Sequence, residues 1–282
     1  MKPTLFKAQN SNIYIVVNPG AGVTQEKYND FANYLSSNGL NVLTYDYTDV
    51  GIEKKGLKSS TADIIYWAQH DFEEAINFIY NIDTEAKLFI LGHSLGGQII
   101  GLSKEALKAD GIILVATQTG HHRFWNFPYN IINYFFWYTI VPILIRIYGY
   151  LPFKTLMNLE NMPKKAALQW ASWCRSRKYL FDKVPAQQQF FKKIKVPLIS
   201  ISFGNDIFAS KKAVNWFTNQ FKNVPLLRFH YSSENVKYKH SALFESEHFS
   251  TLANDLVDLI SDLYPESKKE QDNIKLYSEF SR

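Results

Sequence analysis

The 282-residue chain has a single cysteine, Cys174, which excludes an intrachain disulfide and a cysteine-rich zinc site. The first residues lack the apolar core and small-residue cleavage site of a signal peptide, so we expect a cytoplasmic protein. The most apolar run, Tyr134 to Ile145, has 12 residues, whereas a spanning helix needs about 20. This predicts no transmembrane span and leaves a contact with a membrane surface open.

Two families of phosphate-binding motif are also missing. The glycines form neither G-x-G-x-x-G nor G-x-x-x-x-G-K-[ST], so neither a dinucleotide site nor a P-loop is supported. The net charge is +5, but no recognised nucleic-acid-binding motif accompanies it. We therefore expect no nucleic-acid partner.

Short apolar runs bounded by Gly, Pro, Asn or Asp are present, and they predict buried strands. Longer segments of helical period separate the first four, as in "ADIIYWAQHDFEEAINFIY". Alternating strands and helices predict an α/β fold with a mostly parallel sheet covered on both faces. The expected strands are 13–17, 40–46, 87–92, 111–117, 197–203 and 226–231.

The alternation stops after Thr117 and resumes near Val196, which predicts an inserted subdomain without a clear strand. Its segment from His121 to Phe153 holds 12 aromatic residues in 33, typical of either an ordinary helical core or the walls of an apolar pocket. The expected organisation is a core of residues 1–117 and 194–265, a helical cap of residues 118–193 and a polar tail of residues 266–282.

One stretch, "LFILGHSLGGQIIGL", places Ser94 in Gly-His-Ser-Leu-Gly between an apolar strand and the predicted helix "LGGQIIGLSKEALK". In such a nucleophile elbow, Gly92 and Gly96 flank the sharp turn, and His93 and Leu95 complete it. Ser94 is thus the predicted nucleophile, and the Leu95 amide is the first predicted oxyanion donor. A helix N-cap serine is the alternative, but it would not require both glycines.

A serine nucleophile needs a histidine base and a carboxylate that orients it. Asp206 follows a predicted strand, and His240 lies in the loop after the last one, so they are the predicted partners. Asp206 could instead serve only its local turn. His248 is the reserve base, whereas His230 lies inside a predicted strand.

The loop "VVNPGAGVTQEKY" after the first strong strand offers small residues whose amides can approach a bound carbonyl. Gly20 or Ala21 is the predicted second oxyanion donor, and a plain turn is the alternative.

These segments together resemble the α/β-hydrolase superfamily, and the segment "LQWASWCR" makes the chain similar to bacterial hydrolases of the serine aminopeptidase-like group. The resemblance implies a helical cap over the site, a triad of Ser94, Asp206 and His240, and no metal or organic cofactor. Two departures stand out: only about a dozen residues precede Ile13, where relatives usually carry an extra antiparallel hairpin, and Thr48 stands where relatives often have arginine.

Positive charge is concentrated between Lys164 and Lys195, which holds nine basic residues and one acid. It predicts an anionic or lipid-like substrate, a peripheral contact with an anionic membrane, or only a solvated face. We expect a serine carboxylesterase or lipase that takes an apolar acyl group. A thioesterase or peptidase with the same triad, or a non-catalytic ligand-binding or membrane-binding protein, is the alternative; acyl length and oligomeric state stay open.

Overall fold

The computed structural model describes residues 2–51 and 54–263. A seven-stranded sheet in the order β1-β3-β2-β4-β5-β8-β9 forms its centre, and every neighbouring pair except β1 with β3 is parallel. The predicted parallel sheet is therefore confirmed, and all six expected strands are present. The strands are β1 (Thr4–Phe6), β2 (Ile13–Asn18), β3 (Asn41–Thr44), β4 (Lys87–His93), β5 (Gly111–Val115), β8 (Leu198–Phe203) and β9 (Leu226–Tyr231).

The short strand β1 was not predicted, and it pairs antiparallel with β3. The dozen residues before Ile13 thus supply one antiparallel edge strand. A three-residue strand carries too little periodicity to be recognised in a sequence.

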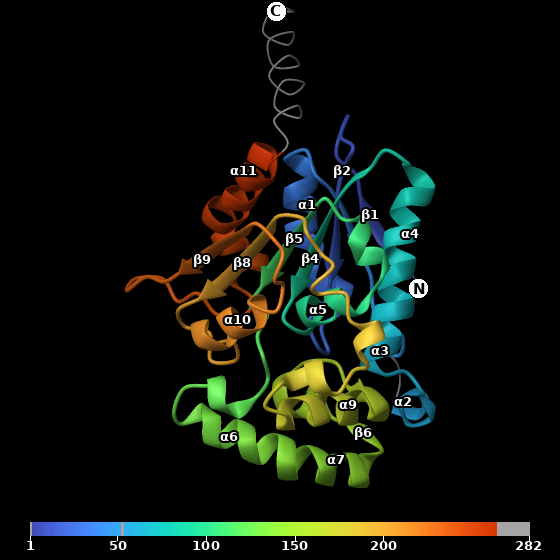
Figure 1. Cartoon of the computed structure of the whole chain (residues 1–282), viewed down its shortest axis with the longest axis vertical. Coiled ribbons are helices and arrows are strands. Elements are labelled where there is room, and N and C mark those ends of the chain that lie inside the picture. Colours follow the sequence, from blue (N-terminus) through green and yellow to red (C-terminus); the bar gives the residue numbers. More distant parts are fainter. Residues whose placement is uncertain (1, 52–53, 264–282) are drawn as a thin grey trace, which may run out of the picture.

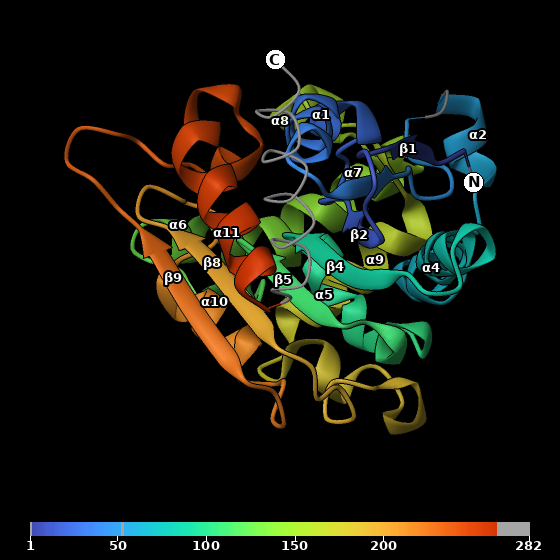
Figure 2. The same cartoon turned by 90° about the horizontal axis from the view of Figure 1, so that it is seen from above.

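Helices cover both faces of the sheet (Figures 1 and 2). Alternate residues of β2 face opposite sides: Ile15 packs in a core cluster with α1 and α11, and Val16 packs in a second cluster with α4 and the segment between β5 and β8. Outside that segment, the helices are α1 (Asn29–Ser37), α2 (Lys54–Ser59), α3 (Ile64–Tyr66), α4 (Phe72–Ile82), α5 (Leu95–Gln98), α10 (Lys211–Thr218) and α11 (Asn254–Leu263).

Residues 118–193, here called the insert, form a helical layer at the end of the molecule opposite α11 (Figure 1). Contrary to expectation, the insert contains two short paired strands, β6 (Tyr150–Leu151) and β7 (Met162–Pro163). The helices of the insert are α6 (Tyr129–Phe135), α7 (Val141–Tyr148), α8 (Phe153–Met157) and α9 (Lys164–Arg175). The predicted polar tail, 266–282, lies outside the described residues.

Candidate active site

Ser94 follows β4 directly and adopts a strained backbone conformation, with φ 53° and ψ −116°. Its amide donates to the carbonyl of Val115 at 2.9 Å, which ties the turn to the neighbouring strand. Non-glycine residues occupy such conformations only where the surrounding structure enforces them, and these places cluster at active sites. The strain marks Ser94 as the tip of a strand-to-helix elbow.

The elbow is too crowded for side chains at its glycines. A Cβ atom on Gly92 would lie 2.3 Å from Gly97 Cα, and one on Gly96 would lie 2.1 Å from the carbonyl oxygen of Asn18. A side chain at Gly92 would therefore collide with α5, and one at Gly96 would collide with the end of β2. Gly97 is equally constrained, because a Cβ atom added there would lie 2.0 Å from Thr117 Oγ1. Sequence reasoning did not single out Gly97, although its place beside Gly96 could have indicated a second position without room for a side chain.

Asp206 and His240 are brought together, with His240 Nδ1 2.7 Å from Asp206 Oδ2. The other oxygen, Oδ1, accepts hydrogen bonds from the amides of Phe208 and Ala209 at 2.8 and 2.9 Å. The carboxylate therefore both stabilises its own turn and binds the histidine. Because an ionised carboxylate only accepts, Nδ1 carries the proton and Nε2 is free to act as a base.

The loop carrying His240 is also held against the elbow, since the rings of His240 and His93 lie 5.1 Å apart. Among the hydrogen bonds of the described residues, none joins Ser94 Oγ to His240. Catalytic hydrogen bonds are often long in free enzymes and tighten when substrate binds. The structure thus brings together two linked parts, the elbow that carries Ser94 and the loop that carries the His240–Asp206 pair, and the triad stays a prediction.

A buried hydrogen-bond chain runs beneath the site. The Gly20 amide donates to Tyr28 Oη at 2.9 Å, Tyr28 Oη lies 2.9 Å from His93 Nδ1, and His93 Nε2 lies 3.2 Å from the carbonyl oxygen of His240. Burial and the nearby His240 lower the pKa of His93 well below its usual 6.5, so the ring is neutral. The carbonyl must accept from Nε2–H, and Nδ1 therefore accepts from the Tyr28 hydroxyl.

These hydrogen bonds distinguish the two residues, Gly20 and Ala21, that were predicted as the second oxyanion donor. The Gly20 amide is already used by Tyr28, so Gly20 is corrected from a candidate donor to a structural position. Within the described residues, no hydrogen bond engages the amides of Leu95 and Ala21. These two amides are the remaining candidates for an oxyanion site.

The helix predicted after Ser94 is shorter than expected. It consists of the four residues of α5, followed by separate 3₁₀ turns at Ile100–Leu102 and Glu105–Lys108. Glycines at positions 96, 97 and 101 weaken a helix because they lose the most backbone entropy on folding. Stabilisation of an oxyanion here must come from individual amides more than from a helix dipole.

Side chains of the insert are bonded to α5. The Tyr179 hydroxyl donates to Gln98 Oε1 at 2.6 Å and accepts from Trp170 Nε1 at 2.7 Å, while Gln98 Nε2 donates to the carbonyl of Gln118 at 2.8 Å. Gln98 lies one helical turn after Ser94. This network fastens the insert to the elbow, and no sequence motif revealed it.

The aromatic residues of the insert divide between interior and surface. Trp137 and Phe153 are buried, but Phe127 and Phe135 are exposed. Two cavities, of about 240 and about 650 Å³, adjoin this part of the chain, and neither is lined by Ser94, Asp206 or His240. Next to the predicted base, the ring of Phe208 lies 5.6 Å from that of His240.

Thr48, which stands where the resemblance leads one to expect arginine, binds the buried Asp71. Its amide and hydroxyl each donate to that carboxylate at 2.7 Å. Burial raises the pKa of Asp71, and the bonds from Thr48 oppose this. Thr48 therefore fixes the loop after β3 with neutral donors, whereas an arginine at this position would bring a positive charge.

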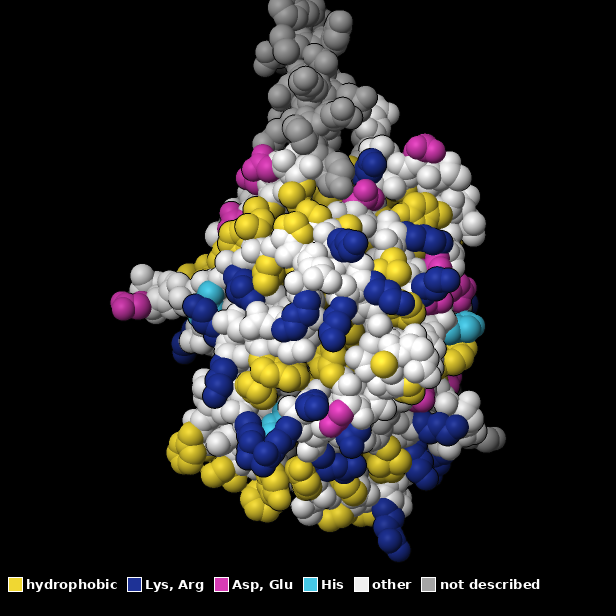
Figure 3. Space-filling model, in the orientation of Figure 1, with side chains coloured by type: hydrophobic (Ala, Val, Ile, Leu, Met, Phe, Trp, Pro, Cys, Tyr) yellow, Lys and Arg dark blue, Asp and Glu magenta, His cyan; other side chains and the backbone are white. Residues whose placement is uncertain are grey.

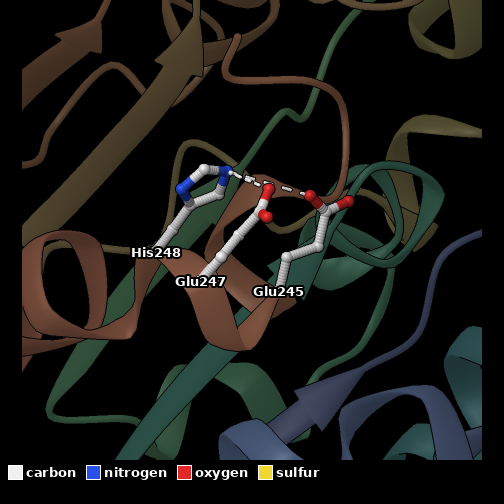
Figure 4. Close-up of side chains that lie close together, drawn as sticks. All are labelled: Glu245, Glu247 and His248. Carbon is white, nitrogen blue, oxygen red and sulfur yellow. Dashed lines mark ion pairs between the residues drawn. The ribbon is translucent and has the colours of Figure 1, made fainter. Parts of the chain in front are cut away.

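His248, the reserve base, is engaged elsewhere (Figure 4). Its Nε2 lies 3.2 Å from Glu247 Oε1 and 3.8 Å from Glu245 Oε2, and its ring packs on Tyr238. One ligand atom from each of the three residues lies within 4.8 Å of the others, a spacing that a cation could bridge. Among the described residues His248 Nε2 has no hydrogen-bond partner and Glu247 is largely exposed, so the cluster carries no assigned role and His248 faces these carboxylates.

Comparison with known proteins places this geometry in context. A family model described as "Serine aminopeptidase, S33" matches residues 9–247. No curated protein matches the chain.

Solved structures with the same fold include several lipases and esterases. The chain is similar to a soluble variant of monoglyceride lipase from Saccharomyces cerevisiae in complex with a substrate analogue, with 16% identity, a TM-score of 0.67 and coverage of 93% of this chain and 91% of that one. It also resembles a thermostable carboxyl esterase from Bacillus coagulans in complex with glycerol, with 14% identity, a TM-score of 0.63 and 93% coverage of both chains. A monoacylglycerol lipase from Paleococcus ferrophilus matches with 14% identity, a TM-score of 0.55 and coverage of 93% and 98%. At these identities the similarity shows the fold alone, which hosts many chemistries.

Proposed function

Because the chain belongs to the serine aminopeptidase S33 family of α/β hydrolases, we propose that it is a serine hydrolase that cleaves carboxylic esters with an apolar acyl group. One observation carries the proposal: His240, which is hydrogen-bonded to Asp206 at 2.7 Å, is also bonded through its carbonyl to His93, the residue before the strained Ser94. A serine hydroxyl needs such an oriented base to become a nucleophile.

In the proposed mechanism, His240 Nε2 takes the Ser94 hydroxyl proton as Oγ bonds to the acyl carbon. The carbonyl electrons move to oxygen, and the Leu95 and Ala21 amides stabilise the oxyanion. Collapse breaks the ester C–O bond, and His240 returns its proton to the leaving alkoxide. Water then attacks the acyl-enzyme by the same steps, releasing the acid and restoring Ser94.

Charge favours an ester over a peptide with a free amino terminus. The insert holds only two acids, and both are engaged: Glu160 pairs with Lys154 at 2.9 Å, and Asp182 accepts from the Ser176 hydroxyl. A substrate ammonium group would meet a net charge of +9 there, with one carboxylate already paired with Lys154 and the other bound to the Ser176 hydroxyl. An ester needs no such partner, so it fits the basic insert better than an aminopeptidase substrate does.

A fluorophosphonate tests the nucleophile directly. The expected result is one covalent adduct in the intact mass of the wild type and none in Ser94→Ala or His240→Ala, with circular dichroism verifying that each variant is folded. Hydrolysis of matched oxygen esters and thioesters of increasing acyl length then separates esterase from thioesterase. A folded wild type that forms no adduct and hydrolyses neither series would overturn the proposal in favour of a non-catalytic binding protein.

A further inference from the structure

The longest apolar element of the chain lies on the outside of the insert. α6, a π turn at Phe136–Ile140 and α7 form one continuous helix from Tyr129 to Tyr148, with 20 residues and a mean hydropathy of 1.4. By length and composition alone it could cross a membrane. The 12-residue run, Tyr134 to Ile145, underestimates the length of this helix, which extends beyond it on both sides.

Only a narrow stripe of this helix is buried. The stripe consists of Asn133, Trp137, Val141 and Ile145, four residues apart. Arg175 at the end of α9 donates to the Trp137 carbonyl at 3.2 Å, and the Trp137 and Trp170 rings lie 4.9 Å apart. The π turn and α7 are therefore packed against α9, an arrangement that a spanning orientation would break.

The rest of the helix and the residues just before it expose large apolar side chains, 40–78% accessible, in the outermost layer of the insert (Figure 1). An apolar surface this continuous marks an interaction site in a soluble protein. We name this set the apolar face: Phe127, Ile132, Phe135, Ile140, Ile143 and Ile147.

Basic side chains lie along one side of the apolar face (Figure 3). The insert has eleven Lys and Arg against two acids, a net charge of +9, while the whole chain carries +5. Figure 3 shows dark-blue Lys and Arg side chains directly above the yellow apolar edge formed by this helix. Exposed examples are Arg123, Arg146, Lys164, Lys165, Arg177 and Lys178.

We propose that the apolar face docks the insert on an anionic phospholipid bilayer, with the α6–α7 helix lying in the plane of the interface. An in-plane helix buries its apolar side among the acyl chains while neighbouring Lys and Arg bind anionic headgroups. A second copy of this chain fits less well, because it would bring two surfaces of net charge +9 together. The docking uses residues outside the proposed triad and does not depend on it.

Vesicle flotation tests the docking. The wild type should float with vesicles that contain phosphatidylglycerol and phosphatidylcholine, and bind phosphatidylcholine vesicles at least tenfold less. Raising the salt concentration should weaken the binding, since surface charges are screened. Ser94→Ala should float like the wild type, which separates this proposal from the proposed function.

The double variant Ile143→Glu/Ile147→Glu should lose flotation and keep wild-type hydrolysis of a soluble short-chain ester. Ile82→Glu is the matched control, because Ile82 is 46% exposed on α4 and lies outside the insert; it should float normally. Unchanged flotation of the double variant would overturn the proposal. A wild type that does not float with anionic vesicles would overturn it as well. A concentration-dependent dimer that only the double variant abolishes, without vesicle binding, would assign the face to a second copy.

Discussion

The imidazole Nε2 of His93 lies 3.2 Å from the carbonyl oxygen of His240, so the residue before the proposed nucleophile holds the loop of the proposed base. On its other side, His93 accepts from Tyr28, which binds the Gly20 amide. One neutral, buried ring thus links three segments: the elbow, the loop after β2 and the loop after β9. Alignment of the site depends on residues that need not touch substrate.

Tyr28→Phe should weaken both fold and turnover. It removes the hydroxyl and leaves the Gly20 amide and His93 Nδ1 unsatisfied, which should lower the free energy of unfolding by about 1–3 kcal/mol. Urea unfolding and ester kinetics measure the two effects, and we expect kcat to fall more than KM changes. Tyr34→Phe is the matched control because its hydroxyl bonds only the exposed Asn254. Equal behaviour of the two variants would contradict a positioning role for Tyr28.

Asp206→Asn should separate the two roles of this carboxylate. The amide oxygen can still accept from Phe208 and Ala209, but the NH₂ group would face His240 Nδ1 and impose the wrong tautomer. We expect kcat to fall about 10⁴-fold. Thermal unfolding should show a smaller loss of stability than in Asp206→Ala, which removes both functions. Near-wild-type turnover in Asp206→Asn would show that His240 does not rely on this residue.

The unfolding free energy should decrease in mild acid, partly through His121. Burial and the positive charges of His122, Arg123 and Arg177 lower the pKa of His121 to about 4. The unfolded chain, with a histidine pKa near 6.5, therefore binds a proton first. Stability from this residue is complete above about pH 6.5 and is lost as the pH falls toward 4.

His121→Asn should make that decrease shallower. Asparagine can still accept from the Arg123 amide, as His121 Nδ1 does at 3.2 Å, but it cannot titrate. Urea unfolding at pH 7, 6 and 5 measures the slope, with the half-exposed His70→Asn as control. A variant slope as steep as that of the wild type would exclude His121 as a source of the acid sensitivity.

Gly96→Ala should prevent stable folding or cost several kcal/mol, because its Cβ would lie 2.1 Å from the Asn18 carbonyl oxygen in the central sheet. Gly20→Ala is the matched control: its nearest neighbour, His93 Nδ1, lies 3.1 Å away and the backbone needs no positive φ. Soluble yield and thermal unfolding compare them. A stable Gly96→Ala protein would mean that β2 and α5 can move apart.

The sequence by itself determined the features that depend on neighbouring residues. Apolar runs of five to seven residues specified six strands, although the expected burial was wrong for the half-exposed edge strand β9. Glycines on both sides of Ser94 specified the elbow, because this signal too is local. Chain order then singled out Asp206 and His240. Sequence periodicity could not reveal the edge strand β1, because this strand has only three residues. It also underestimated the length of the apolar helix, because the helix continues past its most apolar segment.

Only the tertiary structure decided how these parts meet. Tyr28 and His93 are 65 residues apart and His93 and His240 are 147 apart, so no local sequence pattern could predict their hydrogen bonds. The same contacts removed Gly20 from the oxyanion donors by giving its amide a buried partner. Whether the aromatic residues of the insert face inward or outward was decided by α9, because a helix buries only the stripe that another element covers.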